Sequence, residues 1–351
     1  MIAILLPNAA TIQKLAPGVL LSLAVAVVSY LAAPLLKTMT GGSVALPDMV
    51  IALIIGIALH NLVMTPRFEP GMTFCVKKLL RWAIGLLGLR IALGDIIGLG
   101  LGVALLVVAA MIVTVAAALW LAKVLDRDAG FGALAGAANA VCGASATLAT
   151  ATVVPDYKRK SADIAFTVVM ANAISTVVML AYPPLCVWLG YDERLTGIML
   201  GATIHDMAQV VGAGYAVSDS VGNTAVIVKL FRVFLLLPMV LAIGWWFIRN
   251  GEQTGEAKVP VPVFALVFLG LCVLNSLMVA SPGLAAATGY PVIKGLLGEA
   301  SKWGLLIAIA ALGLGTSLTS ILTIGWRHMA VFMGATLVIL LVVIAGLRIV
   351  T

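Results

Sequence analysis

Long apolar stretches and short polar connections alternate along the whole chain. Each stretch holds about 20 mostly apolar residues, which is the length a helix needs to cross the hydrocarbon core of a bilayer. Most ionisable side chains lie in the connections or at the ends of the stretches. The pattern predicts ten or eleven membrane-spanning helices, with approximate cores at residues 18–36, 45–63, 78–94, 97–123, 131–154, 162–189, 196–217, 221–248, 260–280, 300–319 and 327–350.

The composition supports the same interpretation. Of the 351 residues, 63% are hydrophobic and only 10% are charged, whereas a soluble protein carries about 25% charged residues. The longest polar run, residues 249–258, is too short to fold alone. We therefore predict an all-α polytopic membrane protein in which residues 1–351 form a single integral membrane domain.

Two segments of the chain hint at an internal repeat. Residues 87–100 align with residues 312–325 and are identical at six of fourteen positions. In a chain this rich in leucine and glycine, chance explains part of that match, so common ancestry stays open. Because inverted repeats are the usual architecture of secondary transporters, we expect approximate repeats over residues 40–190 and 195–351.

Lysine and arginine give the chain a net charge of +7. They gather at span ends, as at Lys77, Lys78, Arg81 and residues 158–160, where they contact lipid headgroups and orient the protein. No basic domain is visible, so we expect no nucleic-acid partner. With eleven spans, the two sides of the membrane carry eleven and seven of these residues, which favours a cytoplasmic N-terminus.

The cysteines argue against a cofactor or metal. Cys75, Cys142, Cys186 and Cys272 are scattered through apolar segments and form no C-x-x-C pair. This spacing does not suit a disulfide framework or a zinc site. We expect neither a metal nor a cofactor.

Residues 201–214, G-A-T-I-H-D-M-A-Q-V-V-G-A-G, place three polar side chains inside a predicted span. His205, Asp206 and Gln209 lie within five positions, bracketed by glycines. Ionisable groups at membrane depth are costly and face a protein interior or a water-filled cavity. One interpretation is a broken helix that lines a cavity, and the other is a set of hydrogen bonds that ties helices together.

Residues 136–152 are almost all small. This segment either packs closely on its neighbours or unwinds at Cys142 and Gly143. Unwinding would expose backbone N–H groups at a helix N-terminus, where they attract anions. The candidate anion-binding residues here are Asn139, Cys142, Gly143, Ala144 and Ser145.

Two cations lie deep in the predicted span at 221–248. Lys229 and Arg232 are three residues apart and share one helix face. Either Asp206, Asp163 or a bound anion neutralises them, or they extend toward the membrane surface. The second option is strained for Arg232, which is far from both ends of the span.

A fourth segment, residues 312–320, is again small and rich in hydroxyl groups. It is either a second broken helix that faces the Cys142 segment, or an ordinary helix whose Ser and Thr side chains bond to their own backbone. The candidate anion-binding residues here are Gly313, Gly315, Thr316 and Ser317.

Several motifs follow one another in a recognisable order. They include F-x-P-G-x-x-F-x-x-K-x-L-L-R at 68–81, C-G-A-S-A at 142–146, I-H-D-x-A-Q-V-V at 204–211, V-K-x-x-R-V at 228–233 and L-G-L-G-T-S-L at 312–318. Over nearly its whole length, the chain resembles the YeiH-like family of bacterial inner-membrane proteins, which is assigned to sulfate export. The chain departs from the family pattern at position 206, where we expect Glu more often than Asp, and at Asn139.

The resemblance implies a fold like that of the bile-acid and sodium–proton antiporter group. Such a fold has two inverted five-helix repeats, arranged as a panel and a core with two crossing broken helices. The resemblance also implies a small oxyanion as the transported substrate.

Together these observations predict a secondary transporter of a small anion, such as sulfate or a related sulfur oxyanion or sulfonate. The anion would lie near the breaks at Cys142 and Gly313, with Lys229 and Arg232 nearby, and cross by an elevator-like alternating-access motion. His205 and Asp206 would couple the motion to protons, because histidine titrates near neutral pH.

Two alternatives come from the same residues. A sodium-coupled or ion-exchanging transporter would bind a cation at Asp206 or Asp163. An intramembrane enzyme would use His205 with Asp206, but one histidine beside one carboxylate is weak support, so we expect no enzymatic activity. The expected partners are the small anion, the lipid bilayer and a second copy of the chain in a homodimer, and the expected location is the bacterial inner membrane, crossed many times.

Overall fold

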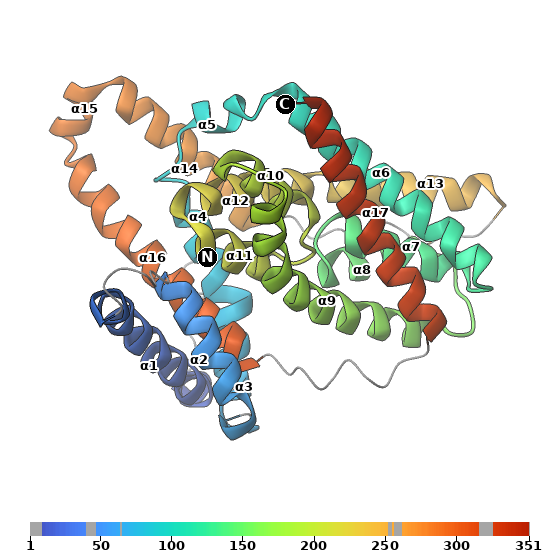
Figure 1. The fold of residues 1–351 in the computed structure, drawn as a ribbon, viewed down its shortest axis with the longest axis horizontal. Helices are drawn as coiled ribbons and strands as arrows, with labels where there is room; N and C mark the ends of the chain where they lie inside the picture. Colours follow the sequence, from blue (N-terminus) through green and yellow to red (C-terminus); the bar gives the residue numbers. More distant parts are fainter. Residues whose placement is uncertain are drawn as a thin grey trace. The chain divides into compact units, whose positions relative to one another are not determined.

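A computed structural model describes residues 9–39, 47–63, 65–251, 255, 262–315 and 326–350. Every regular element in these ranges is a helix (Figure 1), as the apolar pattern predicts. The elements are α1 (Ala9–Met39), α2 (Asp48–Val63), α3 (Glu69–Phe74), the π-helix η1 (Cys75–Leu79), α4 (Leu80–Leu87), α5 (Leu93–Gly98), α6 (Gly100–Val124), α7 (Ala129–Ala140), α8 (Ala144–Ala151), α9 (Lys160–Trp188), α10 (Glu193–Thr203), α11 (Met207–Val217), α12 (Asp219–Phe234), α13 (Leu236–Arg249), α14 (Val263–Ala280), α15 (Pro282–Ala287), α16 (Tyr290–Gly315) and α17 (Trp326–Val350).

Seven helical segments in the described ranges are long and apolar enough to cross a membrane. Six of them are α1, α6, α9, α14, α16 and α17, and α12 with α13 supplies the seventh. Large apolar side chains such as Leu101, Val187 and Ile349 are exposed on them, as contact with lipid requires. The chain is therefore a multi-pass membrane protein. The four remaining predicted spans, at 45–63, 78–94, 131–154 and 196–217, form shorter elements.

The chain divides into two compact units. The first contains residues 1–95 and 263–317, and the second contains residues 96–262 and 318–351. Each unit draws on both halves of the sequence, so the units do not coincide with the predicted repeats at 40–190 and 195–351. The repeats stay a prediction.

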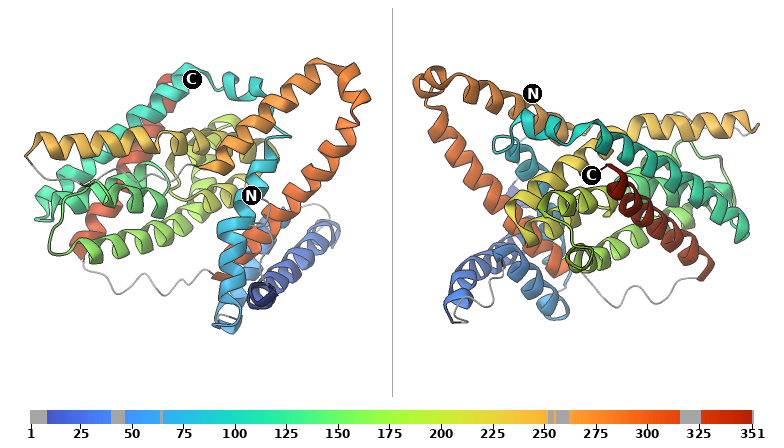
Figure 2. Two further views of the ribbon diagram at one scale, coloured as in Figure 1. Left: turned by 180° about the vertical axis from the view of Figure 1, so that it is seen from behind. Right: turned by 45° about the horizontal axis from the view of Figure 1, so that its top comes forward.

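In the first unit, α1, α2 and α16 pack against one another (Figure 2). Glycines allow the closest approach, because a Cβ added to Gly56 of α2 would lie 2.8 Å from the Cα of Gly313 on α16. Nearby, Nδ1 of His60 hydrogen-bonds with the carbonyl of Leu314 over 2.7 Å. The predicted span at 45–63 is thus a short helix fixed against α16.

The predicted span at 78–94 has different bounds. Helical structure runs without interruption from Glu69 to Leu87 through α3, η1 and α4. It begins at Glu69 and Pro70, where proline suits a first helical turn. It ends at Gly88, where a Cβ would lie 2.2 Å from the carbonyl oxygen of Phe268.

Helices α7 and α8 form a re-entrant hairpin, here called hairpin 1 (residues 129–151). The chain leaves α7 after Ala140 and reverses through Gly143, whose φ of +58° favours glycine. The segment after α8 then returns to the start of α7. A Cβ on Gly130 would lie 2.4 Å from the ring of Tyr157 and 2.8 Å from the side chain of Val154. The prediction that residues 131–154 cross the membrane is therefore wrong, because both ends of the segment lie together.

Helices α10 and α11 form a second hairpin, here called hairpin 2 (residues 193–217), around α12. A Cβ on Gly197 would touch Thr224 and one on Gly201 would touch Val228, so α10 runs parallel to α12. A Cβ on Gly214 of α11 would lie 2.8 Å from the Cα of Gly222, so α11 runs back along α12. The predicted span at 196–217 is also wrong, because its two helical halves reverse at residues 204–206.

The tips of both hairpins lie beside the middle of α9. A Cβ on Gly143 would lie 3.3 Å from Cβ of Ala171, and the backbone N–H of Asp206 donates to Oγ of Ser175 over 3.1 Å. Hairpin 1 precedes the first residue of α9 and hairpin 2 follows its last, so the hairpins enter from opposite ends of this span. The tips thus lie at the middle of a helix that is long enough to cross a bilayer.

Candidate functional site

The candidate site is the meeting point of the two hairpin tips. A Cβ on Gly143 would lie 3.9 Å from the carbonyl oxygen of His205 and 4.0 Å from Oδ2 of Asp206. The structure thus brings together the predicted residues of the second unit from three separate motifs. The site has four helix ends: two C-termini, at α7 and α10, and two N-termini, at α8 and α11.

Lys229 of α12 hydrogen-bonds to backbone carbonyls of both tips. Its fully buried ammonium donates to the carbonyl of Val141 at the first tip and to the carbonyls of Ile204 and His205 at the second. The bond to Ile204 is 2.8 Å long. All three ammonium donors are therefore used by backbone oxygens.

Arg232, one turn further along α12, donates to backbone carbonyls at the end of α7 and in the part of hairpin 2 that leads into its tip. Its guanidinium donates to Asn139 over 2.6 Å and Ala140 over 2.9 Å on α7, and to Gly201 over 2.9 Å and Ile204 over 3.0 Å on hairpin 2. The last carbonyls of a helix lack intrahelical partners and carry partial negative charge. The two buried cations therefore neutralise two helix C-termini, a partner that the sequence analysis did not consider.

The two N-termini at the site differ. At α11, Oδ1 of Asp206 accepts a hydrogen bond from the N–H of Ala208 over 3.2 Å, so a carboxylate caps the helix. At α8 the N-cap is Gly143, which has no side chain, and the sulfur of Cys142 accepts a hydrogen bond from the N–H of Ala146, so no carboxylate of the described residues caps this helix. Its N–H groups, on residues 144–146, have no intrahelical acceptor. Ala144 and Ser145 are only partly buried.

Two polar atoms next to the tips lack hydrogen-bond partners within the described residues. Nε2 of the buried His205 hydrogen-bonds with Oγ1 of Thr336 over 3.2 Å, and Thr336 donates to Oδ1 of Asn139 over 2.7 Å. Nδ1 of His205 is without a partner, as is Oε1 of Gln209. Buried polar atoms in this state are uncommon in native proteins and often mark a site for water or an ion.

Polar residues in the interior of α9 and Thr336 of α17 complete the surroundings of the tips, and the sequence analysis did not single out Thr336. Gln209 donates to Oδ1 of Asn172 over 3.1 Å, and more weakly to the hydroxyl of Thr176. Thr336 is the single serine or threonine of the apolar α17. A polar residue isolated among apolar ones is the sequence signal that could have identified it.

The described part of the fourth predicted segment belongs to the first unit. Gly313 and Gly315 belong to α16 in the first unit, and Gly313 packs against α2. Thr316 and Ser317 lie outside the described residues. Helix α16 is continuous through Gly315, and the break expected further along this segment, facing Cys142, lies outside the described residues and stays a prediction.

The chain is similar to a set of membrane proteins over almost its full length. A sequence model of the family described as conserved hypothetical protein 698 matches residues 17–332. The UPF0324 membrane protein TauZ of Paracoccus pantotrophus is 37% identical, over 99% of both chains. A UPF0324 membrane protein of Rhizobium meliloti is 38% identical, over 94% of this chain and 92% of its own length. No solved structure is significantly similar to the chain.

Proposed function

The chain belongs to the family described as conserved hypothetical protein 698 and is related to UPF0324 membrane proteins, and we propose that it is a secondary transporter of a small anion. The observation that supports this proposal most strongly is the N-terminus of α8, which no carboxylate of the described residues caps, at the meeting point of two re-entrant hairpins. Discontinuous helices that end near the membrane midplane are where transporters bind their substrates.

The charges at the tips favour an anion. Lys229 and Arg232 neutralise the negative C-termini of α7 and α10, so the positive N-terminus of α8 is left without a compensating group of its own. A small oxyanion could accept hydrogen bonds from the N–H groups of Ala144 and Ser145 and from the hydroxyl of Ser145. In this arrangement Lys229 and Arg232 attract the anion from behind the backbone and do not touch it.

The substrate class that we propose is sulfate or a related sulfur oxyanion or sulfonate. A tetrahedral oxyanion has several acceptor oxygens and fits a cluster of converging N–H groups. The small side chains of Gly143, Ala144 and Ser145 leave room for it. The resemblance to the YeiH-like family suggests the same class.

Asp206 is the group that we propose to couple transport to protons. Its carboxylate lies beside the first turn of α8, so its negative charge would repel an anion bound there. Protonation of Asp206 would remove the repulsion and admit the anion. His205, with its unpartnered Nδ1, is placed to exchange the proton.

For the transport step we propose an elevator-like motion of the unit that carries both hairpins. This unit holds every described candidate residue except Gly313 and Gly315. The first unit would then supply the scaffold. A homodimer formed through this scaffold is a further proposal.

The hairpins also change the charge balance that supports the proposed orientation in the bacterial inner membrane. Because hairpin 1 returns to its starting side, Lys158, Arg159 and Lys160 join Arg127 on one side, and Arg194 moves to the other. With the remaining spans as predicted, the balance of lysine and arginine changes from eleven against seven to thirteen against five. By the positive-inside rule this supports a cytoplasmic N-terminus.

A sodium-coupled transporter is the second candidate, and one observation favours it. Oε1 of Gln209 is a buried oxygen without a donor, on the same hairpin as the carboxylate of Asp206. Oxygen atoms of this kind ligate hard cations. Sodium dependence of transport at constant pH, lost in Gln209→Leu, would distinguish this candidate from proton coupling.

The decisive experiment compares Ser145→Asp with Ser145→Asn in purified protein. An aspartate in the first turn of α8 would occupy the open N–H groups as an internal anion. We expect Ser145→Asp to weaken anion binding by about tenfold or more, measured as thermal stabilisation by sulfate, sulfite and short alkanesulfonates, while Ser145→Asn retains binding. The two side chains have nearly the same shape, so the difference reports charge.

Uptake of the same anions into proteoliposomes tests transport itself. If wild type and Ser145→Asp bind the anions equally well, the anion-binding site is not at the N-terminus of α8. If no sulfur oxyanion stabilises the wild-type protein or competes for uptake, the substrate class is wrong.

A further inference from the structure

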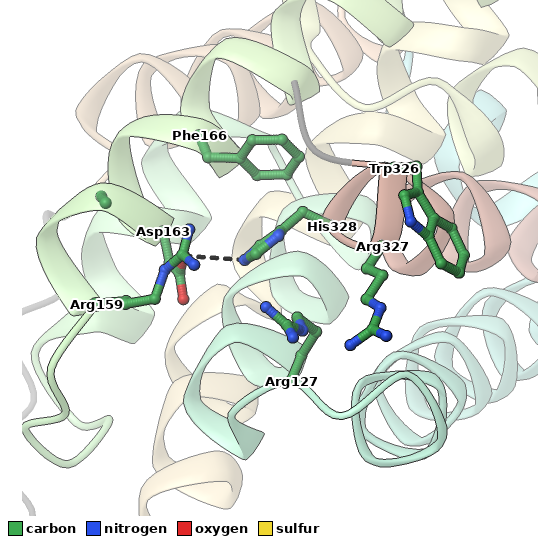
Figure 3. Close-up of a pocket in the computed structure, with 8 residues that line it drawn as sticks. Arg127, Arg159, Asp163, Phe166, Trp326, Arg327 and His328 are labelled. Carbon is green, nitrogen blue, oxygen red and sulfur yellow. Dashed lines mark ion pairs between the residues drawn. The ribbon is translucent and has the colours of Figure 1, made fainter. Parts of the chain in front are cut away.

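A polar cavity lies in the hairpin-bearing unit, away from the tips. It occupies about 280 Å³ where the α6–α7 connection meets the first turns of α9 and α17. Figure 3 shows its lining, which includes Arg127, Arg159, Asp163, Trp326 and Arg327. Asp163 precedes Ala171, the α9 residue beside the first tip, by eight positions, or about 12 Å of helix. The cavity is therefore separate from the candidate transport site.

The cavity is rich in positive charge. Three arginines line it, against one carboxylate, Asp163, which pairs with Nε2 of His328 at 3.3 Å. In Figure 3 the guanidinium groups of Arg127 and Arg327 lie on the same side of His328. The single acid is thus engaged by the histidine, and the excess charge belongs to the arginines.

Two of these arginines, Arg127 and Arg327, have weak partners within the described residues. Nε of Arg127 donates to the carbonyl of Leu125 over 3.3 Å. Arg327 lies 3.9 Å from Asp126, a carboxylate that is 94% exposed, and stacks over the ring of Trp326 at 5.6 Å. An exposed ion pair of this length contributes little, so most guanidinium donors are free to bind a ligand.

The floor of the cavity is held in place by packing. The His328 ring contacts Phe131 with ring centroids 4.6 Å apart and Phe166 at 5.4 Å, both edge to face. Asp163 is buried beside it. Because α7, α9 and α17 each supply one of these residues, the cavity is preformed and a bound ligand would join three elements.

From this arrangement we propose that the cavity binds a phosphate group. Planar guanidinium groups bind phosphate oxygens in pairs, and several of them around one cavity are typical of phosphate recognition. The cavity lies at the ends of three helices and beside Trp326, an aromatic residue suited to the membrane–water interface. The phosphate belongs either to the headgroup of an anionic phospholipid or to free inorganic phosphate.

The test uses the purified full-length chain in detergent. Thermal unfolding is followed in three arms: added phosphatidylglycerol, added phosphatidylcholine, and added inorganic phosphate at constant ionic strength. We expect phosphatidylglycerol or inorganic phosphate to raise Tm by about 4 °C near saturation. The combined variant Arg127→Gln/Arg327→Gln should lose this shift, whereas Arg249→Gln, at the far end of α13, should keep it.

The arms identify the source of the phosphate. Stabilisation by phosphatidylglycerol alone assigns the site to a lipid headgroup, and stabilisation by inorganic phosphate assigns it to a free anion. Equal shifts in wild type and the combined variant, or no shift in either arm, would overturn the proposal. If the combined variant does not fold, Arg327→Gln alone is used, because this side chain is half-exposed, and the titration midpoint should rise at least about threefold.

Discussion

Hairpins 1 and 2 reverse at the same depth and end in different ways. Their first legs, α7 and α10, both finish in carbonyl groups that Lys229 and Arg232 bind. Their second legs do not match. The N-terminus of α11 is capped by the carboxylate of Asp206, while α8 begins at Gly143 and has a hydrogen bond only from the Ala146 N–H to the uncharged thiol of Cys142 among the described residues.

This difference suggests a division of labour between the hairpins. A helix N-terminus that already holds a carboxylate has little capacity for another anion, whereas an uncapped one keeps its N–H groups available. On the proposed function, hairpin 1 therefore binds the anion, and hairpin 2 supplies the acid that regulates its entry.

The largest expected effect is in the labelling of single cysteines from one side of the membrane, because each position either reacts or does not. In a background without the native cysteines, Asp126→Cys and Lys158→Cys should react with an impermeant thiol reagent from the same side, and Asp192→Cys from the opposite side. The reason is that hairpin 1 returns to its starting side while α9 crosses. Reaction of positions 126 and 158 from opposite sides would mean that hairpin 1 spans the membrane, and the comparison of two hairpins would fail.

Removing a buried cation should cost the most stability. Lys229→Met leaves carbonyls of both tips without donors inside the protein, and we expect a loss of about 4 kcal/mol in the free energy of unfolding. Thermal unfolding and the monodisperse yield after purification measure this loss. Arg249→Met is the matched control, since Arg249 is an exposed cation that stacks on Trp245 and should change stability little. If Lys229→Met were as stable as the wild type, the cation would not hold the tips together.

The sequence was sufficient to predict the class of fold and most of the site. Apolar length predicted the seven long helices, and local composition singled out Cys142, Gly143, His205 and Asp206. These signals are local, so one sequence can carry them. A polar residue between apolar neighbours is visible without knowledge of what it touches.

The reversals could not be predicted in the same way. A re-entrant hairpin and a membrane-spanning helix can have the same apolar length. They differ in whether the two ends of the segment lie together, as Gly130 and Tyr157 do at the two ends of hairpin 1. The partners of Lys229 were equally hidden, because backbone carbonyls are present at every position and only the fold decides which are unpaired. Acidic side chains were the visible candidates, and none of those in the described residues forms a direct ion pair with this cation.

Gly143→Ala tests the sharp reversal of hairpin 1. Position 143 has φ +58° and ψ −118°, a conformation that an alanine adopts only with strain, and its Cβ would also press on Ala171. We expect a loss of about 2 kcal/mol in unfolding free energy, measured by thermal unfolding. Gly270→Ala is the control, because a Cβ there meets open space within α14. Equal stability of the two variants would show that the first tip does not depend on glycine.

The smallest structural change, Asp206→Asn, carries the sharpest functional test. Asparagine also caps helices, so α11 should stay folded while the negative charge beside α8 disappears. In the wild type, anion affinity should rise as pH falls, since protonation of Asp206 removes its repulsion, and the total change should be about tenfold or more. In Asp206→Asn the affinity should stay at the acidic wild-type level at every pH. The control is Asp192→Asn, which removes the corresponding cap charge of α10, where Asp192 accepts from Leu195 over 2.7 Å at the far end of hairpin 2. If Asp206→Asn kept the wild-type pH dependence of anion binding, the acid on hairpin 2 would not regulate hairpin 1, and the difference between the two N-termini would be structural only.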